Sequence, residues 1–231
     1  MTSSDTLIVA LDLPSGAAAQ ALVDELGGSV TFYKVGLELL FAGGLDLVKS
    51  LRQQKKRVFL DVKFLDIGNT VERAVAAAAK LGADFLTVHG TDRKTLEAAL
   101  RGRGQSDLKL LAVTVLTSLD HNDLAEQGIA LAPGDLVLKR AKLAYDAGFD
   151  GCIASGQEAA GVRAATGANF TIVTPGIRLS GGEAGDQTRI TTPREAMRSG
   201  ASHIVVGRPV TAAPNPKAAV ATFLSDLEHS I

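Results

Sequence analysis

The stretch Leu81-Gly82-Ala83-Asp84 recurs with small changes as Ala147-Gly148-Phe149-Asp150 and as Ser199-Gly200-Ala201-Ser202. Each version follows an apolar segment with helical spacing and precedes a short β-rich run. Its glycine stands where a helix commonly ends in a left-handed residue, a conformation that glycine adopts without steric cost. The junctions therefore indicate a chain built from repeated helix–strand units.

The β-rich runs number eight, and helical stretches such as 70–81 and 135–147 separate them. Cap residues precede several helices: Asn69, Thr91 or Asp92, and Thr192 followed by Pro193. Strands that alternate with helices pair in parallel through right-handed crossovers. About 29 residues per unit suits a (β/α)8 barrel. We therefore predict a single-domain (β/α)8 TIM barrel over residues 1–231, with strands at 7–12, 31–36, 57–63, 84–89, 109–116, 150–154, 171–175 and 203–207.

A doubly wound open sheet is the alternative architecture, because it too alternates strands with helices. Against it, no G-x-G-x-x-G follows the first strand and the chain contains no P-loop. The predicted strands are also nearly continuous apolar runs, as expected for strands buried on both faces.

Composition narrows the class of protein. The formal net charge of -1 argues against a nucleic-acid-binding surface. The apolar runs are too short and too often broken by charge to predict a membrane span, and residues 1–12 lack the features of a signal peptide. The lone cysteine, Cys152, excludes an internal disulfide and a cysteine-rich metal site. We expect a cytoplasmic protein without nucleic-acid or membrane partners.

The most unusual local feature is Asp61-Val62-Lys63-Phe64-Leu65-Asp66, which places three charges in an apolar run. Because a strand alternates its faces, Asp61 and Lys63 are predicted to point the same way. Opposite charges held where water is scarce are costly unless they are paired, and enzymes use such pairs to tune acids and bases. A structural ion-pair network is the alternative, but the position at a strand end favours a site.

Polar residues gather at the predicted carboxyl ends of the strands, where the active site of such a barrel forms. Two of these residues also have an ordinary structural interpretation. Asp12 could be a turn or cap residue, and Lys34 could be a lysine that buries its stem and keeps its ammonium in water. We leave His89 out of the predicted site, because a lone histidine is more often a satisfied core or loop residue. Together the strand ends indicate a mouth for a charged ligand, formed by Asp12, Lys34, Asp61, Lys63, Thr114, Thr117, Ser118, Arg178 and Arg208.

Two features in the last third of the chain predict a phosphate-binding site. Gly176-Ile177-Arg178 opens a loop of small and polar residues that ends near Gln187, and such a loop can close over a ligand. Gly207 and Arg208 follow the eighth strand, where barrels of this kind often bind phosphate. A flexible surface loop and an exposed arginine are the alternative.

These motifs resemble the orotidine 5′-monophosphate decarboxylase family, in its short bacterial single-function form. The match runs in order from the first strand to the eighth, and its D-x-K-x-x-D-I element is very specific. The resemblance implies loss of CO2 from orotidine 5′-monophosphate to give uridine 5′-monophosphate, without metal or organic cofactor. It is carried by Ala10-Leu11-Asp12, Tyr33-Lys34-Val35-Gly36, the run from Leu60 to Thr70, Leu116-Thr117-Ser118, Thr174-Pro175-Gly176-Ile177-Arg178 and Val206-Gly207-Arg208-Pro209.

The resemblance also implies a role for each charged residue. Lys63 would stabilise negative charge at C6 of the pyrimidine and donate the proton that replaces CO2. Asp61 would hold Lys63 and sit near the leaving carboxylate, and Lys34 and Asp66 would complete an alternating charge array. Asp66 would reach the neighbouring subunit's site with the turn 67–70, which implies a homodimer with two shared sites. The implied substrate contacts are Asp12, Lys34, Asp61, Ile67, Thr70, Thr117 or Ser118, Pro175, Arg178, Gln187, Gly207 and Arg208.

Two other functions remain open at this point. A 3-keto-gulonate 6-phosphate decarboxylase or a hexulose phosphate synthase of the same barrel group would share the D-x-K-x-x-D element. Those enzymes use Mg²⁺ and typically place glutamate where Lys34 stands, and an ammonium would repel the cation. A non-catalytic phosphosugar-binding barrel is the other alternative, but binding phosphate does not require the Asp61–Lys63 pair.

Overall fold

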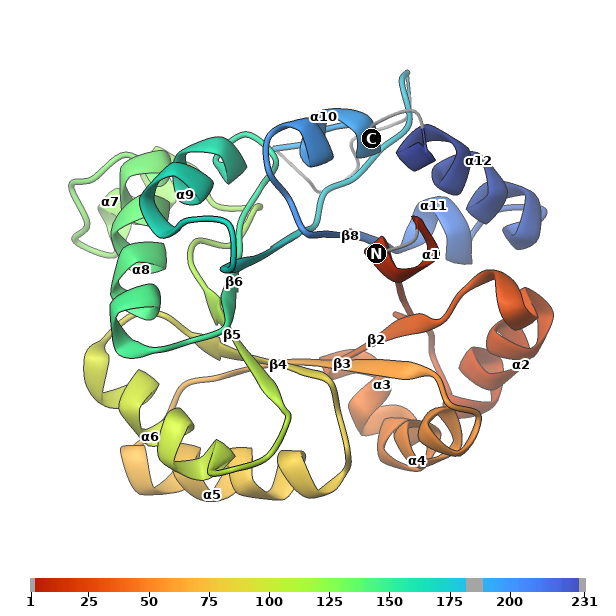
Figure 1. Ribbon diagram of the computed structural model, residues 1–231, viewed down its shortest axis with the longest axis horizontal. Helices are drawn as coiled ribbons and strands as arrows, with labels where there is room; N and C mark the ends of the chain where they lie inside the picture. The colour runs from red at the N-terminus through yellow and green to blue at the C-terminus, as the bar shows by residue number, and fades with distance from the viewer. Residues whose placement is uncertain (1–2, 182–188, 229–231) are drawn as a thin grey trace.

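The chain folds into a closed barrel of eight parallel strands surrounded by helices, as the computed structural model shows for residues 3–181 and 189–228 (Figure 1). Each strand pairs with the next along the chain, and the last pairs with the first. The predicted (β/α)8 architecture is confirmed. The strands are β1 (Leu7–Ala10), β2 (Phe32–Gly36), β3 (Arg57–Phe64), β4 (Phe85–His89), β5 (Lys109–Val113), β6 (Gly151–Ile153), β7 (Thr171–Thr174) and β8 (His203–Val206).

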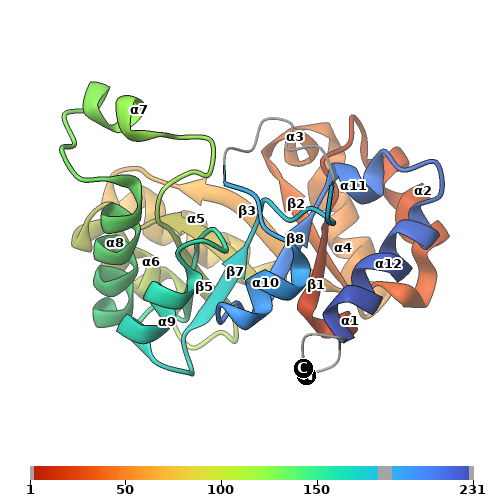
Figure 2. The ribbon, with the colours of Figure 1, turned by 90° about the horizontal axis from the view of Figure 1, so that it is seen from above.

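The helices form a ring outside the strands (Figure 1). Short segments that follow β2, β5 and β8 lie at one end of the barrel, and α1 lies at the other end (Figure 2). That first end is the C-terminal face of the strands, where the ligand site is expected. The helices are α1 (Ser3–Thr6), α2 (Gly16–Leu26), η1 (Gly27–Ser29), α3 (Leu37–Leu39), η2 (Leu40–Gly44), α4 (Leu45–Gln53), α5 (Gly68–Lys80), α6 (Arg93–Arg103), α7 (His121–Glu126), α8 (Pro133–Ala147), α9 (Ala159–Thr166), α10 (Pro193–Arg198), α11 (Arg208–Thr211) and α12 (Pro216–Glu228).

The glycine junctions behave as predicted. Gly82, Gly148 and Gly200 have φ of 73°, 96° and 96°, and each ends a helix before a strand. Of the predicted caps, Asp92 and Thr192 accept hydrogen bonds from the backbone of α6 and α10. The Asn69 cap is wrong: α5 begins at Gly68, and the carbonyl of Ile67 accepts the first backbone hydrogen bonds instead.

β5 ends at Val113 rather than at Leu116. The reason lies at Thr114, whose hydroxyl donates to the carbonyl of Ile153 at 2.7 Å and whose own carbonyl accepts from Arg140 at 2.6 Å. These bonds divert the backbone from the barrel ladder. The residues that follow, Thr117 and Ser118, therefore belong to a loop at the mouth.

Apolar side chains fill the interior of the barrel below the mouth. Phe32 and Phe85 pack edge to face, with ring centroids 5.0 Å apart, and the imidazole of His203 lies 5.2 Å from the Phe85 ring. This filling leaves the C-terminal end of the barrel for polar groups. The interior cluster comprises Ile8, Ala10, Phe32, Phe59, Phe85, Leu111, Val173 and Val205.

His203 should make the stability of the protein depend on pH. Burial, with the nearby cations of Arg57 and Lys109, lowers its pKa to about 4. In the unfolded chain the same group titrates near its ordinary value of 6.5. As the pH falls from 6.5 to about 4, the unfolded chain therefore takes up a proton that the folded chain does not. The free energy of unfolding should fall by about 3 kcal/mol over this window and be unaffected by His203 above it.

The measurement is urea unfolding of the protein and of His203→Phe at pH 7 and pH 5. The difference between the two proteins should change with pH in the predicted direction, because phenylalanine cannot titrate. An identical pH dependence in both proteins would show that His203 does not carry the effect.

Candidate active site

A cavity of about 600 Å³ opens at the C-terminal end of the barrel. Its size is typical of sites for small molecules. The structure brings most of the predicted site residues to its walls, from strand ends and the segments after them that are far apart in the sequence. Those that line it are Asp12, Lys34, Asp61, Lys63, Thr117, Ser118, Pro175, Arg178, Gly207 and Arg208.

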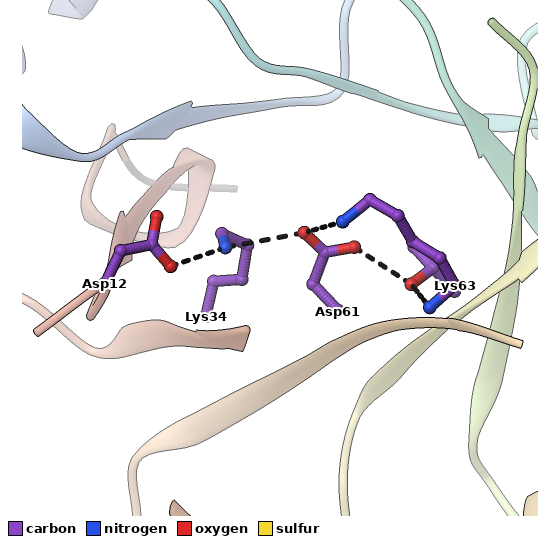
Figure 3. Close-up of polar contacts among 5 residues, drawn as sticks. Asp12, Lys34, Asp61 and Lys63 are labelled. Carbon is purple, nitrogen blue, oxygen red and sulfur yellow. Dashed lines mark hydrogen bonds and ion pairs between the residues drawn. The ribbon is translucent and has the colours of Figure 1, made fainter. Parts of the chain in front are cut away.

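Four of the charged side chains that line this cavity form a row of alternating sign (Figure 3). Lys34 Nζ lies 3.0 Å from Asp12 Oδ1 and 3.4 Å from Asp61 Oδ2. Lys63 Nζ lies 2.9 Å from Asp61 Oδ2. The predicted pairing of Asp61 with Lys63 is therefore present, and Lys34 connects the pair to Asp12. At such distances and an effective dielectric near 20, each contact of Asp61 is worth roughly 4 kcal/mol before desolvation is counted. The contact with Asp12 is worth less, because that side chain is 48% exposed and solvent screens it.

Lys63 reaches this row through an irregularity in β3. Its φ is 51°, a left-handed conformation that costs a residue with a side chain about 1–3 kcal/mol, and the register between β3 and β4 shifts between Leu60 and Phe64. The strain is compensated at Thr87 on β4. Its hydroxyl accepts from the Lys63 backbone N–H at 3.0 Å and donates to Asp61 Oδ1 at 2.9 Å. The two charges therefore meet at a bulge and not through simple strand alternation.

Thr87 is a site-supporting residue that sequence reasoning missed. It is fully buried and does not line the cavity itself. The available signal was a hydroxyl in the middle of the apolar strand β4. Glu38 was also missed: it lines the cavity from α3, two residues after β2 ends.

Burial and charge act in opposite directions on the two inner members of the row. Burial raises the pKa of Asp61, but Lys34 and Lys63 outweigh it and leave that pKa below its ordinary value. Burial lowers the pKa of Lys34, but Asp61 and Asp12 outweigh it and leave that pKa raised. Both groups are therefore charged at neutral pH.

Gly36 gives the row room at the end of β2. A Cβ atom at this position would lie 3.0 Å from both Asp12 Oδ1 and Lys34 Nζ. That spacing is tighter than ordinary van der Waals contact, so a side chain here would push the ion pair aside.

The predicted phosphate residues Arg178, Gly207 and Arg208 also line the cavity, and a Cβ atom at Gly207 would lie 3.9 Å from Asp12 Oδ2. Arg208 begins α11 directly after Gly207, and Arg178 follows Ile177 beyond β7. The backbone N–H of Arg178 donates to the Thr191 carbonyl at 3.0 Å, which holds the two stems of the intervening loop together. Gln187 lies outside the described residues.

The residues assigned to the turn after β3 lie elsewhere. Asp66, Ile67 and Thr70 are exposed, and none of them is among the residues that line the cavity. The carboxylate of Asp66 accepts a hydrogen bond from the Ile67 backbone N–H at 2.6 Å. Within one chain, the structure thus separates these three residues from the charged row.

Two further polar residues, Thr114 and His89, do not line the cavity. The Thr114 hydroxyl donates to the Ile153 carbonyl, and Thr117 and Ser118 are the polar residues of this loop that line the cavity. His89 does not line the cavity either. Burial, with Arg140 and Lys63 nearby, lowers the pKa of His89.

Over residues 3–181 and 189–228, no cluster of three or more His, Cys, Asp or Glu side chains is arranged to hold a metal ion. In the same part of the chain, no helix has both the length and the apolar composition needed to cross a membrane.

Comparisons with known proteins agree with this architecture. The family described as "Orotidine 5′-phosphate decarboxylase / HUMPS family" matches residues 5–223. A protein named orotidine 5′-phosphate decarboxylase from Methylorubrum populi is 52% identical over 225 residues, which are 97% of this chain and 96% of the relative. One of the same name from Rhodopseudomonas palustris is 52% identical over 96% of this chain and 94% of its own length.

Solved structures give the same result in three dimensions. The crystal structure of orotidine 5′-phosphate decarboxylase from Lactobacillus acidophilus has a TM-score of 0.84 and 40% identity, covering 96% of this chain and 98% of its own. An uncharacterized conserved protein from Geobacillus kaustophilus has a TM-score of 0.82 and 35% identity, covering 96% and 99%. Both the sequence match and the shared barrel extend over nearly the whole chain, and the chain belongs to the orotidine 5′-phosphate decarboxylase / HUMPS family.

Proposed function

We propose that this protein converts orotidine 5′-monophosphate to uridine 5′-monophosphate and CO2. The observation that carries the proposal is the row Asp12–Lys34–Asp61–Lys63 in the wall of the cavity. Loss of CO2 leaves an electron pair at C6 in the plane of the pyrimidine ring, where conjugation gives little help. Fixed charges in a site of low polarity can stabilise such a pair without reorganising during the reaction.

Lys63 is the group we assign to C6. Its ammonium is held by Asp61 at 2.9 Å, at the point where β3 opens into the cavity. There it stabilises the developing negative charge and then gives a proton to C6. The broken C–C bond leaves its electrons on C6, and that pair takes the proton, so the products balance as uridine 5′-monophosphate and CO2.

Asp61 and Lys34 hold the lysine in place. Asp61 accepts from Thr87 and contacts both lysines, so its carboxylate has little freedom to move. We assign Asp12 and Lys34 to the ribose hydroxyls as well, because both side chains reach the cavity.

The phosphate group would lie where Arg178, Gly207 and Arg208, from the segments after β7 and β8, line the wall. Gln187 is proposed to join them. Binding energy gained there is remote from C6 and can be used to orient the reacting ring. Thr117 or Ser118 would read the edge of the base, and Pro175 would contact the substrate beside them.

We further propose a homodimer with shared sites. Five large apolar side chains are exposed on the segments that follow the adjacent strands β2 and β3. A clustered apolar surface of this kind marks an interface more often than scattered single residues do. Asp66 and Thr70 flank it and would complete the partner's site. The apolar side chains are Leu37, Phe41, Leu45, Leu65 and Ile67, which are 47%, 89%, 47%, 53% and 78% exposed.

The Mg²⁺-dependent reactions of the same barrel group are disfavoured by Lys34. Its ammonium lies 3.4 Å from Asp61, on the carboxylate that a cation would need, and Lys63 occupies the same oxygen. We also propose a cytoplasmic location, which suits a chain whose single thiol, Cys152, is buried.

The deciding experiment is to follow the absorbance of orotidine 5′-monophosphate on adding the purified protein in the presence of EDTA. We expect full turnover to uridine 5′-monophosphate, and much slower turnover of orotidine, which lacks the phosphate. Activity that disappears with EDTA and returns with Mg²⁺ would overturn the metal-free reaction. Equal rates on both substrates would overturn the phosphate assignment alone.

A further inference from the structure

A buried ion pair joins the loops around the mouth of the cavity. Arg189 belongs to the connection between β7 and α10, and Glu158 to the connection between β6 and α9. The Arg189 guanidinium donates to Glu158 Oε1 at 2.7 Å, and the two side chains are 11% and 10% exposed. Neither residue lines the cavity, so the pair does not itself touch a ligand there.

The same guanidinium also holds the loop after β5. Its second terminal nitrogen donates to the carbonyl of Leu116 at 2.8 Å and lies 3.4 Å from the carbonyl of Val115. Thr117 and Ser118, which line the cavity, follow directly in the chain. One planar cation therefore fixes the backbone that carries the proposed base-reading side chains.

The pair is also tied to the proposed phosphate side. Two residues after Arg189, the N–H of Thr191 donates to the Gly176 carbonyl at 3.2 Å, and its carbonyl accepts from Arg178 at 3.0 Å. Thr191 also packs closely against the loop after β6. A Cβ atom added at Gly156 would lie only 2.3 Å from Thr191 Cγ2. The Arg178 backbone and Arg189 are thus joined by a short path of hydrogen bonds and close packing.

As a stabilising element this ion pair is poor. Among the described residues, Arg189 Nε and Glu158 Oε2 are buried without a hydrogen-bond partner. Unsatisfied buried groups are costly, and a buried pair contributes little to stability unless its hydrogen bonding is complete. Its geometry is better explained by the need to hold three loops in one arrangement.

We infer that Arg189, held by Glu158, is a positioning residue that couples phosphate binding after β7 to base recognition at Thr117 and Ser118. The inference rests on the proposed function, since it uses the phosphate and base assignments made there. Arginine suits the task because its fork can reach a carboxylate and a carbonyl together, whereas a lysine ammonium is a single point charge.

The test compares inhibition by uridine 5′-monophosphate and by uridine, which lacks the phosphate, in the unchanged protein and in Arg189→Met. In the unchanged protein the phosphate should improve binding strongly. The quantity to compare is the ratio of the inhibition constant of uridine to that of uridine 5′-monophosphate. In Arg189→Met we expect this ratio to fall by about 10-fold, a size typical of coupling between two sites. The inhibition constant of uridine itself should stay nearly the same. Glu158→Gln should shift the ratio in the same direction, and the two changes together should be less than additive.

The matched control is Arg103→Met, which breaks the 2.7 Å pair with Asp150, a pair whose two residues do not line the cavity. It should leave the ratio of the two inhibition constants unchanged. Equal weakening of both inhibitors in Arg189→Met, or no change in either, would overturn the coupling. If the unchanged protein does not distinguish the two inhibitors, the phosphate assignment fails instead. Should Arg189→Met not fold, Arg189→Lys and Glu158→Gln carry the same comparison.

Discussion

Lys63→Ala is expected to lower kcat for orotidine 5′-monophosphate by about 10⁴-fold or more, because one ammonium performs two tasks. A fixed charge next to a developing anion contributes about 10²–10³-fold, and a positioned proton donor adds about 10²–10⁴-fold. Alanine removes both contributions. It also leaves Asp61 facing the substrate's carboxylate with Lys34 as its remaining ion-pair partner in the row.

Binding of the product should survive this change. Asp12, Arg178 and Arg208 remain in the cavity wall, so the inhibition constant of uridine 5′-monophosphate should change far less than kcat does. The measurement is steady-state turnover together with product inhibition and a thermal unfolding curve. Turnover within tenfold of the unchanged protein would remove Lys63 from the chemistry.

The chain offers a matched control for this variant. Lys55 is the other described non-glycine residue with positive φ, at 59°, and it lies in the turn before β3. Lys55→Ala therefore makes the same change of side chain in a similar backbone conformation, away from the cavity. Its turnover should equal that of the unchanged protein.

The fold could be predicted from the sequence because the patterns that mark its helices and strands are local and repeated. Gly82, Gly148 and Gly200 mark the helix ends, and the apolar runs between polar segments mark the strands. Each of these patterns arises from residues within one turn or one strand. The Asn69 error has the same origin: a single polar residue near a helix start is a weak signal when a backbone carbonyl can serve instead.

Only part of the candidate site could be predicted from the sequence. Strand ends placed Asp12, Lys34 and Lys63 at one mouth, and the structure brings their charges into one row. The bulge at Lys63 could not be read from the sequence, because it depends on a hydrogen bond to Thr87 on another strand. The Arg189 contacts are equally hidden, since its partners Glu158 and Leu116 lie 31 and 73 positions away in the chain.

Mixing two inactive variants, Asp66→Ala and Lys63→Ala, is expected to restore about a quarter of the unchanged protein's activity once the subunits have exchanged. If Asp66 serves the partner's site, a hybrid dimer has one site with both residues intact and one site with neither. Random pairing of equal amounts makes half of the dimers hybrids, and half of the sites in each hybrid work, which gives the quarter. Each variant alone should remain inactive in the same assay.

The control mixture distinguishes a shared site from any general effect of mixing. Asp61 and Lys63 are in contact at 2.9 Å within one chain, so both belong to the same site. Mixing Asp61→Ala with Lys63→Ala should therefore restore nothing, because every site in the hybrid lacks one of the two groups. If Asp66 acted on its own chain, its mixture with Lys63→Ala would behave in the same way and stay inactive. Recovery in the first mixture and none in the second is the pattern that requires Asp66 to cross the subunit interface, and it would explain why this exposed carboxylate lies apart from the cavity of its own chain.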